Sequence, residues 1–199
     1  MELLLNKAVS GSDIQKLLDI PVGTGRFFEL YDSLGIEVIG ADVSEDMISK
    51  SREKVDNEIQ STNVSFQHGD ILDRSTIDIG PDIVVCIRLL NWFSFDEVRE
   101  AIINIDGIDA EYAIVGIRTQ SDEEIGLKKR LWLLQAQIIS RLSNREITNN
   151  NSINIHPESG FKQLIQEKFK IEHRVLVDVG TSPKKFGSEY CIYLLKSIN

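Results

Sequence analysis

Cysteine and histidine are scarce in this chain of 199 residues, which contains two cysteines and three histidines. Cys86 and Cys191 both lie inside apolar, strand-like runs, which indicates small core residues in a reducing compartment and argues against a disulfide. The cysteines and histidines also lack the spacing of a metal-binding set. We therefore expect neither a disulfide nor a bound metal ion.

Positive charge and long apolar runs are also in short supply. Lys and Arg total 22 against 31 Asp and Glu, which gives a net charge of −9. This balance argues against nucleic acid as a partner, because the phosphate backbone is bound mainly through cationic contacts. No run approaches the roughly 18 apolar residues of a membrane-spanning helix, and the short, acidic opening Met1–Leu5 is unlike a secretory signal. A soluble, cytoplasmic protein without membrane contact is expected.

Short apolar runs alternate with longer amphipathic segments along the chain. This pattern predicts an α/β protein with a mainly parallel sheet, and the length suits one domain over residues 1–199. The expected strands are 16–20, 37–41, 64–68, 82–87, 112–117, 171–179 and 189–196. The expected helices are 24–34, 44–59, 95–105, 121–145 and 159–168, with a polar loop over 148–154. No helix joins the last two strands, so they should pair antiparallel.

The most informative stretch is the turn after the first strand, Asp19-Ile20-Pro21-Val22-Gly23-Thr24-Gly25-Arg26-Phe27-Phe28. A strand, a glycine turn and a helix N-terminus in succession direct backbone N–H groups toward a ligand. A dinucleotide-binding turn needs a small residue three positions after its second glycine, and this chain has Phe28 there. The turn is therefore expected to be wider and to lack the geometry that cradles a pyrophosphate.

Three successive strands are followed by a carboxylate, in Asp19, Asp42 and Asp70. In an open parallel sheet, ligands bind beyond the carboxyl ends of the strands, so these side chains should share one cleft. For any one of them alone, a helix cap or a loop contact is the alternative. Asp42 would also suit the ribose of a dinucleotide, so a nucleotide-dependent dehydrogenase stays open as a minor alternative.

The acidic residue, the G-x-G turn and the bulky residue after it resemble motif I of the class I S-adenosylmethionine (SAM)-dependent methyltransferases, here written DIPVGTGRF. The order of strands and helices from about Lys16 to Lys196 is similar to that family as well. The resemblance implies a three-layer, Rossmann-like α/β fold with a seven-stranded, mostly parallel sheet and an antiparallel last strand. It also implies SAM as the cofactor and S-adenosyl-L-homocysteine (SAH) as the product.

The resemblance assigns the methionine end of the cofactor to the glycine turn. Asp19 would hold the ammonium group, and Thr24 would donate to the carboxylate. Pro21, Gly23 and Gly25 would complete this part of the cofactor site.

The resemblance assigns the ribose and the adenine to the ends of the next two strands. Asp42 would take the ribose hydroxyls in a bidentate contact, and Val43 and Met47 would lie near the adenine. Asp70 would receive the adenine amino group. The remaining cofactor contacts implied by the resemblance are Gly69, Ile71 and Arg88.

The segment after the fourth strand, residues 88–93, should lie beside the reactive methyl group. It resembles the R-L-L-H-H-like stretch of small-molecule methyltransferases, with Asn91 in place of the first histidine. Arg88 would either orient an anionic substrate or pair with a local carboxylate. Asn91 would contact substrate or cofactor, or cap the loop. His156 is a candidate general base, and an ordinary loop histidine is its commoner interpretation.

Two further residues are candidates for the substrate site. Arg118, at the end of the fifth strand, would bind an acidic group or pair with Asp122. Trp92 is expected chiefly to pack against the following helix, and a cavity wall is its second interpretation. Methyl transfer depends mostly on alignment in a dry site, so catalytic residues leave little mark on the sequence.

Together these patterns predict a methyltransferase that acts on a small molecule. A SAM-binding module without turnover and a methyltransferase with a protein substrate are the alternatives. Only about fifteen residues precede the first strand, where the family usually has one or two helices that close over the cofactor. A short lid, a lid from a neighbouring subunit in a homodimer, or a late start of the chain would each account for this.

Overall fold

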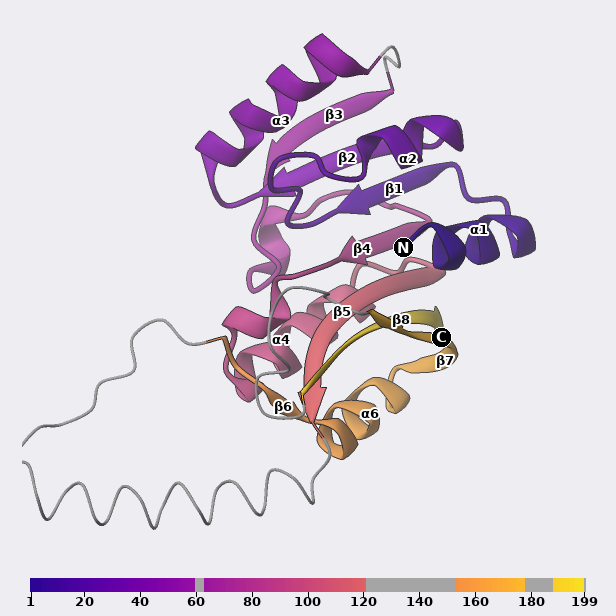
Figure 1. Cartoon of the computed structure of the whole chain (residues 1–199), viewed down its shortest axis with the longest axis vertical. Coiled ribbons are helices and arrows are strands. Elements are labelled where there is room, and N and C mark those ends of the chain that lie inside the picture. Colours follow the sequence, from indigo (N-terminus) through magenta and orange to yellow (C-terminus); the bar gives the residue numbers. More distant parts are fainter. Residues whose placement is uncertain (60–62, 121–152, 178–187, 199) are drawn as a thin grey trace, which may run out of the picture.

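The computed structural model describes residues 1–59, 63–120, 153–177 and 188–198, and it confirms the expected α/β architecture (Figure 1). The strands of the sheet follow the order β3-β2-β1-β4-β5-β8-β7. Their bounds are β1 Lys16–Asp19, β2 Glu37–Asp42, β3 Val64–His68, β4 Ile83–Cys86, β5 Tyr112–Gln120, β7 Phe169–Val177 and β8 Glu189–Ser197. Because β1 lies between β2 and β4, the strand order reverses at β1.

The last strand runs antiparallel, as expected from the absence of a crossover helix before it. β8 lies between β5 and β7 and pairs antiparallel with both, whereas the pairings among β1 to β5 are parallel. An additional strand, β6 (His156–Pro157), pairs in parallel with the end of β5. The sequence did not predict β6, because two residues are too few to produce an alternating pattern.

Helices cover both faces of the sheet and give the expected three layers. α1 (Glu2–Gly11), α2 (Phe28–Ser33) and α3 (Glu45–Glu58) pack on one face, and α4 (Phe95–Asp106) and α6 (Glu158–Gln166) on the other. Neighbouring residues of β1 supply opposite cores, since Leu17 packs in the α1–α2 layer and Leu18 in the α4–α6 layer. Apolar burial on both faces holds the layers together and fixes the register of the strand.

α1 occupies the segment before β1, where the sequence analysis expected no defined element. Leu4, Leu5 and Ala8 lie at helical spacing and are buried. At the end of the helix, the Ser12 hydroxyl donates to the Tyr112 hydroxyl at 3.2 Å, and Tyr112 is the first residue of β5. α1 therefore packs near the N-terminal ends of the strands, and it does not cover the glycine turn at their carboxyl ends (Figure 1).

α2 is shorter than expected, because residues 23–27 form turns and the helix begins at Phe28. Two 3-10 helices, η1 (Arg74–Thr76) and η2 (Leu90–Trp92), follow β3 and β4. The helix expected over 121–145 and most of the polar loop over 148–154 lie outside the described residues.

The first turn of α4 generates a prediction about stability. Ser94 Oγ accepts a hydrogen bond from Glu97 N at 3.3 Å, and Glu97 Oε2 accepts one from Ser94 N at 2.6 Å. Ser94→Ala removes the first of these bonds and should lower the free energy of unfolding by about 1 kcal/mol. Urea unfolding followed by circular dichroism measures the change. Ser49→Ala, at an exposed position inside α3, is the matched control, and an equal loss in both variants would contradict the capping role.

Candidate functional site

The candidate site lies at the carboxyl ends of β1 and its neighbours, where the strand order reverses. Asp19 is the last residue of β1 and lies in register with Gly40 of β2 and Val85 of β4. The chain leaves β1 toward α2 on one face and leaves β4 toward α4 on the other. Two connections that depart to opposite faces open a crevice between them, which is the usual place for a ligand in such sheets.

Both glycines of the turn adopt backbone conformations that favour glycine. Gly23 has a φ of 56° and Gly25 a φ of 68°, in the left-handed region. A Cβ on Gly25 would also collide with the Phe28 ring, which is buried beneath the turn. Phe28 thus occupies the space that a small residue leaves open in a dinucleotide-binding turn, which agrees with the expectation from the sequence.

Asp42 holds the glycine turn in place from the end of β2. Its Oδ2 accepts a hydrogen bond from Gly23 N at 3.0 Å, and its Oδ1 accepts one from Ser44 N at 2.9 Å. Ser51 of α3 adds a bond from its hydroxyl to Gly23 O at 2.7 Å. The Asp42 side chain is buried and lies under the turn, and it is absent from the lining of the cavities described below.

A first cavity of about 280 Å³ lies between the turn and the end of β4. Most of the expected cofactor residues of the turn contribute to it. Its lining consists of Asp19, Pro21, Val22, Gly23, Thr24, Arg26, Phe27, Met47, Ile87 and Arg88. The cavity therefore combines one carboxyl group, two guanidinium groups and an apolar wall.

Asp19 is the unusual group of the first cavity because its carboxyl is almost fully buried. The Tyr31 hydroxyl donates to Asp19 Oδ2 at 3.1 Å, and no described cation forms an ion pair with this carboxyl. Burial raises the pKa of Asp19 to about 7; the Tyr31 hydrogen bond lowers it, and the charge of Asp42 raises it further. A bound cation would favour the ionised form, so the first cavity is suited to an ammonium or a sulfonium.

A second cavity of about 330 Å³ adjoins the first. Its lining consists of Arg88, Asn91, Trp92, Arg118, Ile153 and Tyr190. Arg88 lines both cavities, and its backbone N–H donates to the Tyr190 hydroxyl at 3.0 Å. The structure thus brings together four residues that the sequence analysis placed near the acceptor, namely Arg88, Asn91, Trp92 and Arg118.

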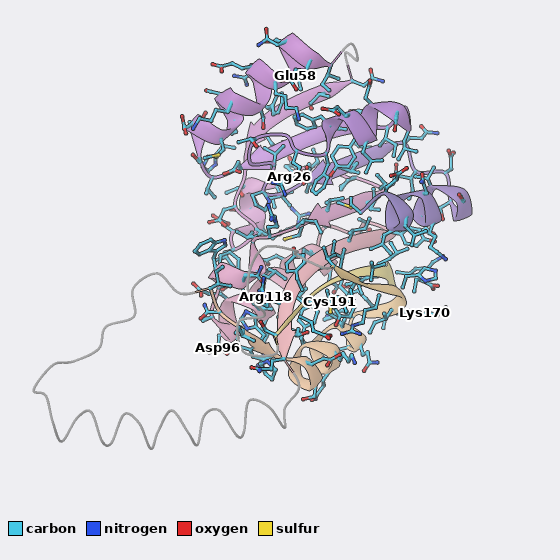
Figure 2. All side chains as sticks on the ribbon, viewed as in Figure 1. Arg26, Glu58, Asp96, Arg118, Lys170 and Cys191 are labelled. Carbon is cyan, nitrogen blue, oxygen red and sulfur yellow. The ribbon has the colours of Figure 1, made fainter. Side chains whose placement is uncertain are left out.

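Asn91 ties the walls of the second cavity to each other. Its Oδ1 accepts a hydrogen bond from Arg118 N at 2.6 Å, and its main-chain oxygen accepts one from Asn154 N at 2.6 Å. The Arg118 side chain extends from β5, and its Nη1 donates to Ser188 Oγ at 3.3 Å (Figure 2). The carboxamide oxygen of Asn91 therefore fixes the loop after β4 to β5, which corresponds to the capping alternative.

Trp92 differs from its main expectation. It was expected to pack against α4, but its side chain is 59% exposed and lines the second cavity. The 3-10 turn of η2 directs Leu90 and Asn91 inward, which leaves the next residue at the surface. The wall interpretation therefore describes Trp92 better.

His156 lines neither of the two cavities. It is 3% exposed in β6, its Nε2 lies 3.0 Å from Leu90 O, and its ring packs against Phe95. Burial lowers its pKa. This placement gives no support to a general base, and the residue belongs to a strand instead of a loop.

Of the residues expected near the adenine, Met47 lines the first cavity, and the others lie outside the lining of both cavities. Asp70 is half-buried, and its Oδ1 accepts a hydrogen bond from Leu72 N at 2.9 Å. The Ile71 side chain packs in the core under α4. Val43 is 56% exposed beside Asp42, and Gly69 is buried at the end of β3.

Three polar residues of the site were not singled out by the sequence analysis. Arg26 lines the first cavity (Figure 2), and its position directly after the second glycine was the available signal. Tyr31 lies on α2 one helical turn after Phe28, but nothing in the sequence indicates that it faces Asp19. Tyr190 reaches the site only through the pairing of β8 with β5, where it lies opposite Arg118.

Comparisons with known proteins agree with this architecture. Residues 17–108 match a family model described as a methyltransferase domain, a segment that runs from β1 through α4 and includes the first cavity. No curated protein matches the chain. Within the described ranges, none of the helices is long and apolar enough to cross a membrane.

Several solved methyltransferase structures are similar to this chain. Magnesium protoporphyrin IX methyltransferase from Synechocystis PCC 6803, crystallised with SAH, has a TM-score of 0.69 at 14% identity, over 98% of this chain and 80% of that one. The N-methyltransferase NodS from Bradyrhizobium japonicum WM9, also with SAH, has a TM-score of 0.66 at 16% identity, over 99% and 85%. A SAM-dependent methyltransferase from Methanosarcina mazei has a TM-score of 0.66 at 16% identity, over 94% and 95%. The chain therefore has the Rossmann-like fold of these methyltransferase structures, and its residues 17–108 match a methyltransferase domain model.

Proposed function

We propose that this chain binds SAM in the first cavity and transfers its methyl group to a small molecule in the second cavity, releasing SAH. The observation that supports this best is the buried Asp19 carboxyl, which lines the first cavity and has no ion-pair partner among the described residues. A cationic ligand would supply the missing counter-charge. The match of residues 17–108 to the methyltransferase domain supports the same function.

The lining of the first cavity fits the charged end of SAM. Asp19 would accept hydrogen bonds from the ammonium group, while Arg26 and the Thr24 hydroxyl would donate to the carboxylate. The second guanidinium, on Arg88, lies at the boundary with the second cavity. The ammonium group of SAM would thus lie beside a carboxylate of the protein, and the carboxylate of SAM beside a guanidinium.

The ribose and adenine fit the surroundings of Asp42. Each oxygen of Asp42 accepts one backbone N–H, and each has a second acceptor position that a ribose hydroxyl would use. Met47 and the exposed Val43 offer apolar surface for the adenine. Asp70 remains our candidate for the adenine amino group, but the Ile71 side chain is held in the core and would contribute only through its backbone.

When bound, SAM supplies an electrophilic methyl carbon on a sulfonium, and the protein's part is to hold the acceptor against it. Arg88, which lines both cavities, would align the acceptor at their boundary. Burial raises the pKa of Tyr190 to about 12, so its hydroxyl stays protonated and is no general base. No described carboxylate or histidine lines the second cavity, which favours catalysis by alignment with proton loss to solvent.

Isothermal titration calorimetry with SAM, SAH and NAD tests the proposed cofactor. SAM and SAH should bind with one site per chain, whereas NAD should not bind, because Phe28 fills the space under the turn. Tight binding of NAD or no binding of SAM would contradict the proposal. A methyl-release assay against a panel of metabolites then separates an enzyme from a SAM-binding module without turnover and from a methyltransferase that needs a protein substrate.

Asp42→Asn should weaken SAM binding by roughly tenfold or more. The substitution removes the negative charge that accepts two backbone N–H groups and, as we propose, two ribose hydroxyls. Calorimetry gives the dissociation constant, and thermal unfolding shows whether the variant is folded. Asp46→Asn, an exposed acid four residues along on α3, is the matched control and should bind SAM like the wild type. Equal affinity in the two variants would reject the ribose contact.

SAM affinity should rise by roughly tenfold between pH 5.5 and pH 7. The free protein binds a proton at Asp19 up to its raised pKa of about 7, and a cationic ligand prefers the ionised carboxylate, so binding releases this proton. Calorimetry across this range, in two buffers with different ionisation enthalpies, measures both the affinity and the released proton. Tyr31→Phe removes the hydrogen bond to Asp19 and should move the transition to higher pH.

Asp19→Asn provides the control for this pH dependence. The variant carries no titrating group at this position, so the rise in affinity over the same range should disappear. In the wild type the raised pKa stabilises the folded state below about pH 4, and this contribution is lost as the pH approaches 7. Asp19→Asn should therefore be more stable than the wild type at pH 8. An unchanged pH profile of SAM binding would show that another group titrates.

A further inference from the structure

Among the described residues, the second cavity concentrates positive charge without a matching acid; Asp122, the alternative partner of Arg118, lies outside the described residues. Arg88 and Arg118 both line it, and the rest of its described lining is neutral. Neither guanidinium forms an ion pair with a described carboxylate. Both guanidinium groups also influence the Tyr190 hydroxyl. The charges of Arg88 and Arg118 lower its pKa, whereas burial, which has the larger effect, raises it. Two cations near one hydroxyl repel each other unless an anion lies between them.

Arg118 is the more deeply placed of the two. Within the described part of the chain, its buried Nε has no hydrogen-bond partner, and its Nη1 donates to the Ser188 hydroxyl at 3.3 Å. A buried charged donor without an acceptor is costly, and such groups usually mark the place of a ligand or an ion. The backbone of Arg118 is fixed by Asn91, so the side chain extends from a rigid strand.

Apolar surface faces the same cavity. Trp92 and Ile153 line it and are 59% and 47% exposed, which is unusual for side chains of this size. The Tyr190 ring adds a third apolar wall. A ligand with a flat apolar body would cover these side chains while its charged end reached the Arg118 guanidinium.

We propose that the acceptor is a small organic anion with a flat apolar body, and that its carboxylate or phosphate group binds Arg118. This identity as acceptor rests on the proposed function, whereas the anion site itself rests on the second cavity alone. Of these two cavities, Arg118 lines the second and Arg88 lines both, so the anionic group lies at the far end and the methylated atom at the Arg88 end. The anionic group is a handle for orientation, because pairing with a guanidinium lowers the nucleophilicity of a carboxylate.

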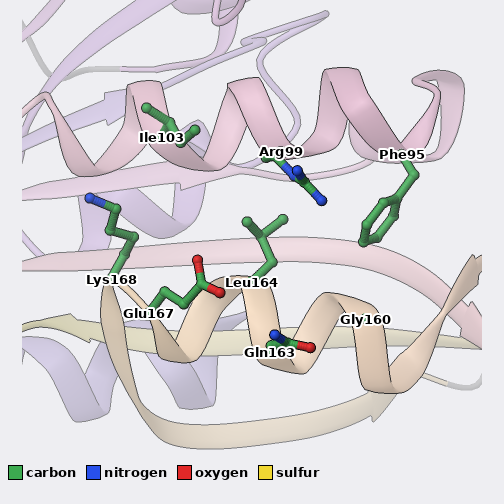
Figure 3. A pocket seen from close by; sticks show the side chains of 8 residues that line it. All are labelled: Phe95, Arg99, Ile103, Gly160, Gln163, Leu164, Glu167 and Lys168. Atoms are coloured by element: carbon green, nitrogen blue, oxygen red, sulfur yellow. The ribbon is translucent and has the colours of Figure 1, made fainter.

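A third cavity, of about 250 Å³ between α4 and α6, shows the contrasting arrangement (Figure 3). Its cations Arg99 and Lys168 share the lining with Glu167, and Lys168 pairs with Asp106 at 3.2 Å. In the third cavity the positive charges therefore lie near carboxylates of the protein itself, and they do not indicate an anionic ligand. Arg99 is exposed and lines neither the first nor the second cavity, which makes Arg99→Gln a matched control for Arg118→Gln.

Calorimetry with 2-naphthoate, 2-naphthyl phosphate and the uncharged 2-naphthamide tests the proposal on the full chain, with and without SAH. At least one of the two anions should bind about tenfold more tightly than the amide, and the better one identifies the handle as carboxylate or phosphate. Arg118→Gln should weaken anion binding by about tenfold and leave the amide unchanged, while Arg99→Gln should change neither. Trp92→Ala should weaken the anions and the amide alike, because the indole contacts the apolar body.

Equal binding of anion and amide, no binding of any of the three probes, or an unchanged anion affinity in Arg118→Gln would each overturn the proposal. If Arg118→Gln does not fold, the anion-to-amide ratio of the wild type and of Arg118→Lys decides instead. Charge-dependent binding of 2-naphthoate without any binding of SAM would leave the anion site standing and reject the proposed methyl transfer. Binding of SAM without discrimination between anion and amide would do the reverse.

Discussion

The geometry of the candidate site depends on one buried carboxylate, Asp42, which accepts backbone N–H groups from two separate turns. It holds Gly23 of the turn after β1 and Ser44 at the start of α3. Buried N–H groups without acceptors are costly, so the loss of Asp42 would release both turns together. The Ser51 hydroxyl donates to the carbonyl oxygen of Gly23, so β2 and α3 together bind both the N–H and the carbonyl group of this glycine. The shape of the first cavity is thus determined by β2 and α3 as much as by β1.

Asp19 has the opposite environment, although it ends the neighbouring strand β1. Its carboxyl receives one hydrogen bond from Tyr31 and lies in an apolar layer beside the charge of Asp42. The protein therefore contains one acid whose charge is used to organise backbone and another whose charge is disfavoured until a cation arrives. A site built in this way gains affinity for cationic ligands from the repulsion and desolvation that it relieves on binding.

The glycine turn and the carboxyl beside it could be predicted from the sequence because they follow from local order. A strand, a glycine turn and a helix lie next to one another in the chain, so Gly23, Gly25 and Asp19 are placed by short-range constraints. The second cavity depends on contacts between distant segments. Tyr190 reaches Arg88 only because β8 pairs antiparallel with β5, and His156 is buried because β6 adds two residues to the end of the same strand. Local patterns do not contain these pairings.

The boundary between the two cavities shows how such distant contacts position one side chain. Arg88 has a φ of 68°, a left-handed conformation that costs a residue with a side chain about 1 kcal/mol. Its N–H is held by the Tyr190 hydroxyl, which fits against β5 only because residue 116 is a glycine; a Cβ there would collide with that hydroxyl. The strained conformation of Arg88 therefore depends on Tyr190, and the position of Tyr190 depends on Gly116. These three residues come from the end of β4, from β8 and from β5. Strain maintained by three elements at the meeting point of two cavities is more easily explained by the alignment of a ligand than by stability.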